Sequence, residues 1–282
     1  MGLYEISLAT VVGINIILAV SLNLITGYCG QISLGHAAFF GIGAYTAALL
    51  AKIGWPIYLT LGAGFLLAGI VGAVIGLTSL RVREDFLAIV TMGVAFLFVG
   101  IVRQQEFLGG EMGISGIPSP GMEKPAYLCL VLIFVLLAIL FSWYVKRSWM
   151  GYAFDAVADD EQTAKTLGLD VKSYKITAFA MGTAMAGLAG GLYAYYTRFI
   201  IPDVFGFIQS ITILSMVAVG GIGSIFGVVL ATIFLSLMPE IFRFINDYKL
   251  LLYGILLFSV MRFAPDGLAG FYKMLYKKRN LR

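Results

Sequence analysis

Charged side chains are scarce in this sequence of 282 residues. Asp, Glu, Lys and Arg make up only 12% of it, hydrophobic residues make up 60%, and the mean hydropathy is +0.96. A soluble domain carries about 25% charged residues, so this chain lacks the polar surface that solubility requires. We therefore exclude a soluble protein. The net charge of +4 is interpreted as a signal of orientation in a membrane rather than of nucleic-acid binding.

Ionisable groups are nearly absent from the apolar runs themselves. The only histidine, His36, is the one such group well away from a predicted helix end. An ion-driven carrier needs a titrating or ion-binding group inside its bundle, so the energy for any pumping must enter elsewhere. His36 is interpreted as a hydrogen-bonding residue at the start of a helix, with a substrate ligand or a proton relay as the alternatives.

Patterns that indicate catalysis or metal binding are missing as well. Cys29 and Cys129 lie 100 residues apart, without the spacing of a metal site, and are expected to be small apolar fillers. An embedded transferase would need an acidic metal-binding cluster beside a lipid-facing cavity, and no such cluster is visible. Met1–Ser7 has no Lys or Arg, and the apolar run after it is too long for a cleaved signal peptide. We therefore expect no catalytic residue, no metal and no cofactor in this chain.

Long apolar runs occupy most of the chain. A helix needs about 20 apolar residues to cross a hydrocarbon core about 30 Å thick. The runs predict an all-α, polytopic helical membrane protein, with residues 1–282 as one domain of about eight or nine spans. The predicted spans are 4–25, 32–50, 57–77, 86–102, 126–145, 176–196, 208–237 and 249–263.

Two glycine-containing segments, near 27–36 and 220–224, interrupt these runs. Irregular backbone at membrane depth is tolerated only where protein covers it or where it lines a wet cavity. Broken segments in matching positions of two halves often mark a transport pathway, and the sequences around the two breaks are loosely similar. The two breaks are therefore interpreted either as parts of a transport pathway or as simple re-entrant turns. The candidate path-lining residues are Gln31, Ser33, His36, Thr91, Gly220 and Gly221.

Small residues recur four positions apart in several of the predicted spans. This spacing lets transmembrane helices approach closely, so it predicts a tightly packed bundle, with sliding surfaces for a conformational cycle as the alternative. The rows are Gly64, Ala68, Gly72 and Gly76; Gly43, Ala47 and Ala51; and Gly182, Ala186 and Gly190.

Residues 146–175 form the one long polar segment and hold 10 of the 34 charged side chains. Lys and Arg in short loops favour the cytoplasmic side. This segment has five, the tail from Arg262 has six, and Arg81 and Arg83 follow the third predicted span. All three regions are predicted to be cytoplasmic, which puts the N-terminus outside and the C-terminus inside. The same count requires residues 208–237 to leave and re-enter one side of the membrane, or to cross it twice.

A short helix with both ends specified is predicted within the polar segment. Asp159 can cap its start while Gln162 reaches back. Asp160 and Glu161 suit the first turn of a helix, and Gly168 supplies a left-handed residue at its end. Two turns are not stable alone in water, so either the bundle or a partner must hold them; a solvated helix without a partner is the alternative. An apolar edge suited to a groove on another protein comprises Ala164, Leu167 and Leu169.

Four ordered stretches carry a resemblance to a known family. They are SLNLITGYCGQISLGHAAFFGIGAY at 21–45, FLAIVT at 86–91, GGEMGISGIP at 109–118 and VGGIGSIFG at 219–227. In them the chain resembles the permeases of branched-chain amino acid ABC transporters, most nearly the LivM-type subunit. The segment DDEQTAKTLG at 159–168 is similar to the family's cytoplasmic coupling segment.

The resemblance implies a permease subunit of an ABC importer in the cell (inner or plasma) membrane, surrounded by lipid, that moves branched-chain amino acids inward. The implied partners are a second, LivH-like permease, two cytoplasmic ATPases that bind Mg-ATP, and a periplasmic or extracellular solute-binding protein. Residues 146–175 would be the coupling loop, and Arg103–Pro125 would receive the binding protein. The residues implied to couple to the ATPases are Asp159, Asp160, Glu161, Ala164, Leu167 and Gly168.

Two features depart from the family pattern. Gln162 and Thr163 stand where small or apolar residues are common. The family often carries arginines after the glycine that matches Gly151, where this chain has Tyr152, Phe154 and Asp155. Three other functions stay open. A urea or short-amide permease looks alike at this level, and a self-sufficient channel or ion-coupled carrier would work without ATPases. A membrane-embedded enzyme is disfavoured because no acid, base or metal constellation is visible.

Overall fold

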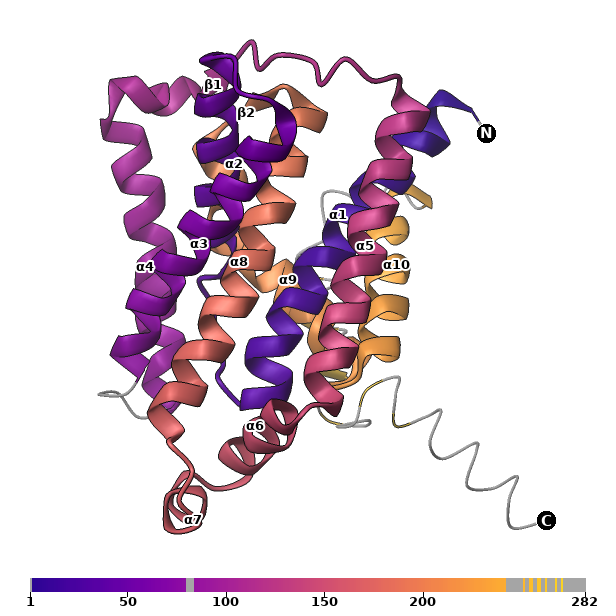
Figure 1. Ribbon diagram of the computed structural model, residues 1–282. Coiled ribbons are helices and arrows are strands. Elements are labelled where there is room, and N and C mark those ends of the chain that lie inside the picture. Colours follow the sequence, from indigo (N-terminus) through magenta and orange to yellow (C-terminus); the bar gives the residue numbers. More distant parts are fainter. Residues whose placement is uncertain are drawn as a thin grey trace, which may run out of the picture.

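The computed structural model describes residues 2–79 and 84–241, together with scattered positions between 251 and 270. Within these ranges most residues are helical, and the predicted all-α class is confirmed (Figure 1). The long helices are α1 (Leu3–Leu22), α2 (His36–Lys52), α3 (Ile57–Ser79), α4 (Glu84–Gln104), α5 (Lys124–Arg147), α8 (Val171–Thr197), α9 (Phe207–Gly220) and α10 (Ile225–Ile241). The shorter helices are η1 (Asn23–Tyr28), η2 (Glu106–Leu108), η3 (Gly110–Met112), α6 (Trp149–Asp159), α7 (Glu161–Thr166) and η4 (Pro202–Phe205).

Six helical stretches among the described residues are long and apolar enough to cross a membrane. They are Leu3–Tyr28, Ile57–Thr78, Phe86–Gln104, Lys124–Arg147, Val171–Thr197 and Pro202–Gly220, and the apolar helix Ile225–Glu240 is shorter. The chain is thus a multi-pass membrane protein. The turn with Arg81 and Arg83 lies outside the described residues. So do most of the basic tail from Arg262 onward and most of the predicted span 249–263.

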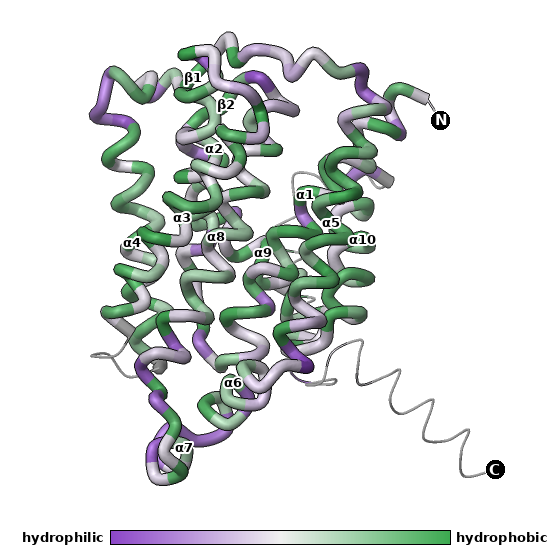
Figure 2. The backbone as a smooth tube through the Cα atoms, in the orientation of Figure 1, coloured by the Kyte–Doolittle hydropathy of each residue, from purple (hydrophilic) through white to green (hydrophobic). Residues whose placement is uncertain are grey.

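The helices pass up and down between two ends of the bundle. Helices α6 and α7 lie at one end, and the N-terminus and the loop between α4 and α5 lie at the other (Figure 1). Hydrophilic positions gather at these two ends, with hydrophobic ones along the helices between them (Figure 2). The bundle therefore has the polarity of a chain that spans a bilayer.

Helices α9 and α10 form an antiparallel hairpin, broken at residues 221–224 (Figure 1). The end of α10 returns to the N-terminal end of the bundle, where the Tyr4 hydroxyl donates to the Glu240 carboxylate at 2.6 Å. Farther along the same helices, Asn15 Nδ2 donates to Ser236 Oγ at 3.1 Å. This hairpin agrees with both alternatives predicted for residues 208–237, a re-entrant element and two crossings of the membrane.

Helix α8 packs against α2 and α3 through glycine. A Cβ added at Gly43 would lie 1.9 Å from the carbonyl oxygen of Gly187, and one added at Gly72 would lie 1.8 Å from Thr183 Oγ1. These spacings leave no room for any side chain, so the tight packing predicted from the small-residue rows is confirmed. Close backbone approach stabilises helix pairs in lipid, because the hydrophobic effect does not drive the association of helices there.

The loop between α4 and α5 is ordered by contacts with the segment after α8. Strand β1 (Ile114–Ser115) pairs antiparallel with β2 (Phe199–Ile200), with Ile114 opposite Ile200. Arg103 also forms an ion pair with Asp203 of η4. The part of the loop at Glu106–Met112 is exposed apart from Leu108, Gly109 and Gly110, which are half-buried.

Candidate functional site

The polar segment folds into two helices that join α5 to α8 at one end of the bundle (Figure 1). The first, α6, was not predicted. Its buried side of Phe154 and Val157, with Met150 half-buried, follows the spacing of an amphipathic helix. That spacing, with Ser148 directly before the first helical residue, is the sequence signal that predicts it.

The start of α7 lies one residue later than predicted. Asp160, not Asp159, is the N-cap, and its carboxylate accepts a hydrogen bond from the Thr163 amide. Asp159 is instead the last residue of α6, because two helices meet here. The hydrogen bond from the Thr163 amide lowers the pKa of the Asp160 carboxyl, since it stabilises the charged form.

The end of α7 is as predicted. Gly168 has the left-handed backbone with φ +85°. Its amide donates to the Lys165 carbonyl at 3.0 Å, and the Leu169 amide donates to the Ala164 carbonyl at 3.1 Å. These two bonds make a Schellman motif, which turns the chain sharply into α8.

One side of α7 is held by the bundle itself. Ala164 is buried, and the Glu161 carboxylate forms an ion pair with Lys175 of α8, whose side chain is only 4% exposed. The predicted apolar edge is therefore wrong for Ala164, which points into the chain and is not available to a partner. Leu167 is 73% exposed, and Leu169 is half-buried. The bundle thus fixes α7, and Leu167 is its protruding apolar residue.

Exposed aromatic residues extend this surface along α6. Trp149 is 75% exposed and Tyr152 is 66% exposed. They lie three residues apart, on one side of the helix, and Asp155 continues that side and is also exposed. Phe154 is fully buried. Among the three positions after Gly151 that depart from the family pattern, Tyr152 and Asp155 are therefore the ones that another protein can reach.

The other side of α6 contacts the first break. This break consists of the π-helix η1 and the irregular residues 29–35. Gly30 has φ +71°, and a Cβ added to it would lie 3.2 Å from both Cα and Cβ of Ala158 in the last turn of α6. A larger residue at Gly30 would strain the backbone and push α6 away.

The two breaks contact each other and the end of α5. The Gly223 amide of the second break donates to the Asn23 side-chain oxygen at 2.9 Å. Lys146 Nζ donates to the Gly223 carbonyl and also lies 5.0 Å from the centre of the Tyr28 ring. Lys146 is two residues before the N-cap of α6. The end of α5, directly before α6, therefore contacts both breaks.

Several predicted path residues meet beside the first break. The Leu34 amide donates to Thr91 Oγ1 at 2.9 Å, which joins the break to α4. His36 is the first residue of α2, and its Nε2 lies 2.7 Å from Ser21 Oγ. This confirms the interpretation of His36 as a hydrogen-bonding residue at a helix start.

Polar atoms at the same place lack partners. Gln31 Oε1, Ser33 Oγ and His36 Nδ1 are buried without a hydrogen-bond partner among the described residues. Buried polar atoms are nearly always paired with protein or with ordered water. Together with Asn23 Nδ2 of η1, which also lacks a partner within the described part of the chain, these atoms could receive water or a polar ligand at the first break.

The remaining path candidates, Gly220 and Gly221, lie in the second break. Both are buried. Gly220 ends α9, and a Cβ on it would lie 2.4 Å from the Val228 Cα of α10, so its role in the structure is to let the two arms of the hairpin approach. Gly221 has φ +100°. The two breaks come together through Asn23 and Gly223, which the sequence did not single out.

The family described as "Branched-chain amino acid transport system / permease component" matches residues 5–261. The high-affinity branched-chain amino acid transport system permease protein LivM of Escherichia coli K12 is 34% identical over 98% of this chain and 72% of its own length. The LivM protein of Salmonella typhimurium is 34% identical over 94% of this chain and 69% of its own length. LivH of E. coli K12 is 23% identical over 90% of both chains.

No solved structure matches the chain. The family match covers most of the sequence, and the identity to LivM proteins exceeds the identity to LivH, as the resemblance in the sequence predicted. The chain therefore belongs to the family of branched-chain amino acid transport system permease components.

Proposed function

We propose that this chain is the membrane-spanning permease subunit of an ATP-binding-cassette importer that moves branched-chain amino acids into the cell. It would have no catalytic role, and Mg-ATP would be hydrolysed by separate subunits. Family membership and the names of the LivM relatives support this function. The observation that carries it is the α6–α7 unit, which protrudes at one end and contacts the first break at Gly30. It directly follows the end of α5, where Lys146 contacts both breaks.

The proposed orientation puts α6 and α7 in the cytoplasm, the N-terminus outside and the C-terminus inside. The five Lys and Arg of residues 146–175 support it. The α9–α10 hairpin opens toward the N-terminal end, so one further span after α10 would bring the basic tail to the cytoplasmic side. With α2, α10 and that last span added to the six long stretches, the whole chain would cross the membrane about eight or nine times, as one permease domain.

The proposed partners attach at opposite ends. The ATPase side of the importer, expected to consist of two ATPases, would dock on the exposed surface of Trp149, Tyr152 and Leu167. Exposed large apolar groups beside a charged rim are typical of protein interfaces. The solute-binding protein would dock on the loop Arg103–Pro125. A second permease subunit similar to LivH would complete the membrane part, and the similarity of this chain to LivH proteins supports a paired arrangement of related subunits.

The proposed coupling route runs from α7 through α6 to the breaks. A pull on Leu167 would move α7 with α8, because Glu161 and Lys175 join them. The contacts of Ala158 with Gly30 and of Lys146 with Gly223 would carry the movement to both breaks. There the unpaired atoms of Gln31, Ser33 and His36 would meet the substrate, with Thr91, Gly220 and Gly221 beside them. Such coupling needs two states with different contacts at both ends.

The test uses the chain reconstituted with its ATPases, second permease and binding protein. Leu167→Asp should reduce both leucine uptake and the stimulation of ATP hydrolysis by the loaded binding protein, because a charge replaces the protruding apolar group. Leu167→Met should leave both unchanged. Unchanged uptake and hydrolysis in Leu167→Asp would remove the coupling role of α7.

Two further measurements on the same preparation test the substrate and the class. Uptake of leucine, isoleucine and valine should exceed uptake of urea, and the reverse order would assign an amide permease. Liposomes that contain this chain alone should show no leucine flux, whereas flux without ATPases would identify a channel or an ion-coupled carrier.

A further inference from the structure

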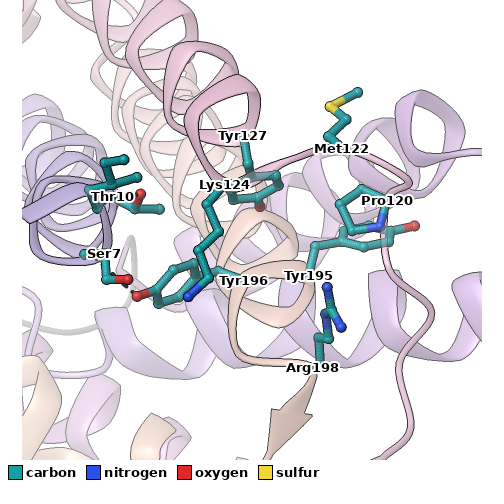
Figure 3. Close-up of a pocket in the computed structure, with 10 residues that line it drawn as sticks. Ser7, Thr10, Pro120, Met122, Lys124, Tyr127, Tyr195, Tyr196 and Arg198 are labelled. Carbon is teal, nitrogen blue, oxygen red and sulfur yellow. Dashed lines mark hydrogen bonds between the residues drawn. The ribbon is translucent and has the colours of Figure 1, made fainter. Parts of the chain in front are cut away.

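A cavity of about 280 Å³ opens at the end of the bundle opposite α6 and α7. Figure 3 shows residues from the starts of α1 and α5 and from the end of α8 around it. Its lining includes two basic residues, Lys124 and Arg198, and the three tyrosines Tyr127, Tyr195 and Tyr196, but no carboxylate. The cavity is therefore electrostatically suited to an anion.

The three tyrosine hydroxyls already form hydrogen bonds within the protein, so their rings line the cavity without offering a free donor to a ligand. Tyr127 donates to the Leu192 carbonyl at 2.6 Å, and Tyr196 donates to the Ser7 carbonyl at 3.2 Å. The Tyr195 hydroxyl lies 2.8 Å from Thr60 Oγ1. The groups with hydrogen-bond donors left over are therefore the two cations.

Both cations are exposed, and Arg198 is held in an unusual conformation. It follows the last residue of α8 with φ +56°, and it is the one residue other than glycine with a positive φ in the described part of the chain. Its guanidinium donates to Ser119 Oγ at 2.9 Å, which leaves further N–H groups for a ligand. No ion pair of Lys124 is described within residues 2–79 and 84–241.

A second cavity, of about 180 Å³, lies along the same helices. It is apolar, and its lining comprises Ile17, Phe65, Phe134, Leu137, Ala138, Phe141, Met185 and Leu188. On α5, Tyr127, Phe134 and Phe141 are spaced by seven residues, which places them on one side of the helix. With a rise of 1.5 Å per residue, these 14 residues extend over about 21 Å. Both cavities are lined by α1, α5 and α8, the charged one at the end of the bundle and the apolar one farther along the helices. The two cavities together are called the groove.

We propose that this groove binds one phospholipid of the membrane leaflet at this end, which is the outer leaflet in the proposed orientation. Lys124 and Arg198 would hold the anionic phosphate, and the tyrosines lie at the depth where aromatic rings meet lipid head groups. An acyl chain would lie along Phe134 and Phe141. The length of about 21 Å from Tyr127 to Phe141 suits a lipid head group followed by part of an acyl chain. A free amino acid has no acyl chain.

A branched-chain amino acid fits this groove less well. Its ammonium group would find no carboxylate among the lining residues, and its short side chain would leave the lower cavity empty. One lipid molecule would fill both cavities, with its phosphate at the two cations and an acyl chain in the apolar cavity. The proposal is independent of the transport function, since lipid binding and uptake are measured separately.

The charge test measures the binding of dioleoyl phosphatidylglycerol to the full-length chain in detergent by native mass spectrometry. Each basic residue near an anionic lipid raises the binding affinity by about a factor of five. The double variant Lys124→Gln, Arg198→Asn should therefore bind the lipid about thirtyfold more weakly. Asn suits the left-handed conformation at position 198. Lys52→Gln, which removes an exposed cation at the same end, is the matched control and should bind as the parent does.

The groove test fills the apolar cavity. Ala138→Phe should also weaken binding, whereas Ile133→Phe, on an exposed side of α5, should not. Thermal unfolding of each variant checks its fold, and the charge test decides alone if Ala138→Phe does not fold. Parent-like lipid binding by the charge variant would overturn the proposal. Displacement of the lipid by leucine would overturn it too, since the cavity would then hold an amino acid.

Discussion

At single positions, this protein depends on the absence of side chains as much as on their presence. The carbonyl oxygen of Gly187 occupies the space where a side chain at Gly43 would begin. Helices α2 and α8 can therefore touch through their backbones. Gly62 of α3, in contrast, has nothing within 4 Å of its Cβ position, so glycine is not needed there for packing.

The first prediction compares these two glycines. Gly43→Ala should lower the free energy of unfolding by about 1–3 kcal/mol, the usual cost of overpacking, because the new Cβ meets backbone and not a flexible side chain. Gly62→Ala should cost little or nothing. Unfolding of both variants in detergent micelles checks this, and equal stabilities would contradict the close approach of α2 and α8.

The second prediction concerns the ion pair between Glu161 and Lys175. Lys175→Met should destabilise the protein by about 3–5 kcal/mol, since it leaves a partly buried carboxylate without its partner. The double variant Glu161→Gln, Lys175→Met should recover most of that loss. A double-mutant cycle on unfolding free energies measures the coupling, and strictly additive effects would mean that the two residues do not interact.

At the scale of elements, α7 is a short helix with strong ends. Asp160 caps its start and the Schellman motif at Gly168 closes its end. Its other support comes from α8 and from α6, and α6 in turn contacts the first break at Gly30. The order of α7 therefore depends on its cap and on its neighbours rather than on its own length.

The third prediction is that this cap depends on pH. Because the folded state lowers the pKa of the Asp160 carboxyl, the cap stabilises α7 fully above the ordinary Asp pKa, and the stabilisation is lost as the pH falls through the lowered value. Asp160→Ala should speed hydrogen exchange of the α7 amides several-fold at neutral pH. Asp160→Asn, an equally good cap, should keep their protection and remove its pH dependence. Protection factors corrected for intrinsic exchange measure this, and equal protection in both variants would contradict the assignment of the cap.

At the scale of the whole molecule, the two hairpins α1–α2 and α9–α10 turn toward the α6–α7 end, where their breaks meet through Asn23 and Gly223 (Figure 1). The polar segment, the breaks and the end of α5 thus form one connected unit. The loop between α4 and α5 lies at the other end. A signal from one face to the other has to pass along the helices between them.

The fourth prediction tests this polarity in a background without Cys29 and Cys129. A cysteine at Met122, in the α4–α5 loop, should react with a membrane-impermeant maleimide in intact cells. A cysteine at Leu167 should react only after permeabilisation. Both side chains are exposed, so access depends on sidedness. Labelling of position 167 in intact cells would reverse the proposed orientation.

Composition and local patterns determined much of this protein in advance. Apolar runs predicted the helices, the charge bias together with the glycines at 220–224 predicted the hairpin, and Gly168 predicted the end of α7. These features depend on neighbours in the sequence, which is why they could be recognised there. The short polar helix α6 carried such a signal in its apolar spacing and was nevertheless missed.

Only the tertiary structure decided which sides of the helices pack. In a membrane, lipid is as apolar as the protein core, so a buried Ile17 and an exposed Ile133 look the same in sequence. The same holds for Ala164, whose burial depends on α6 and α8, and for the contact between Asn23 and Gly223, which are 200 residues apart. The sequence determined that this chain spans a membrane and presents a capped polar segment. The long-range packing of its helices decided what that segment touches, because no local pattern encodes a contact between distant helices.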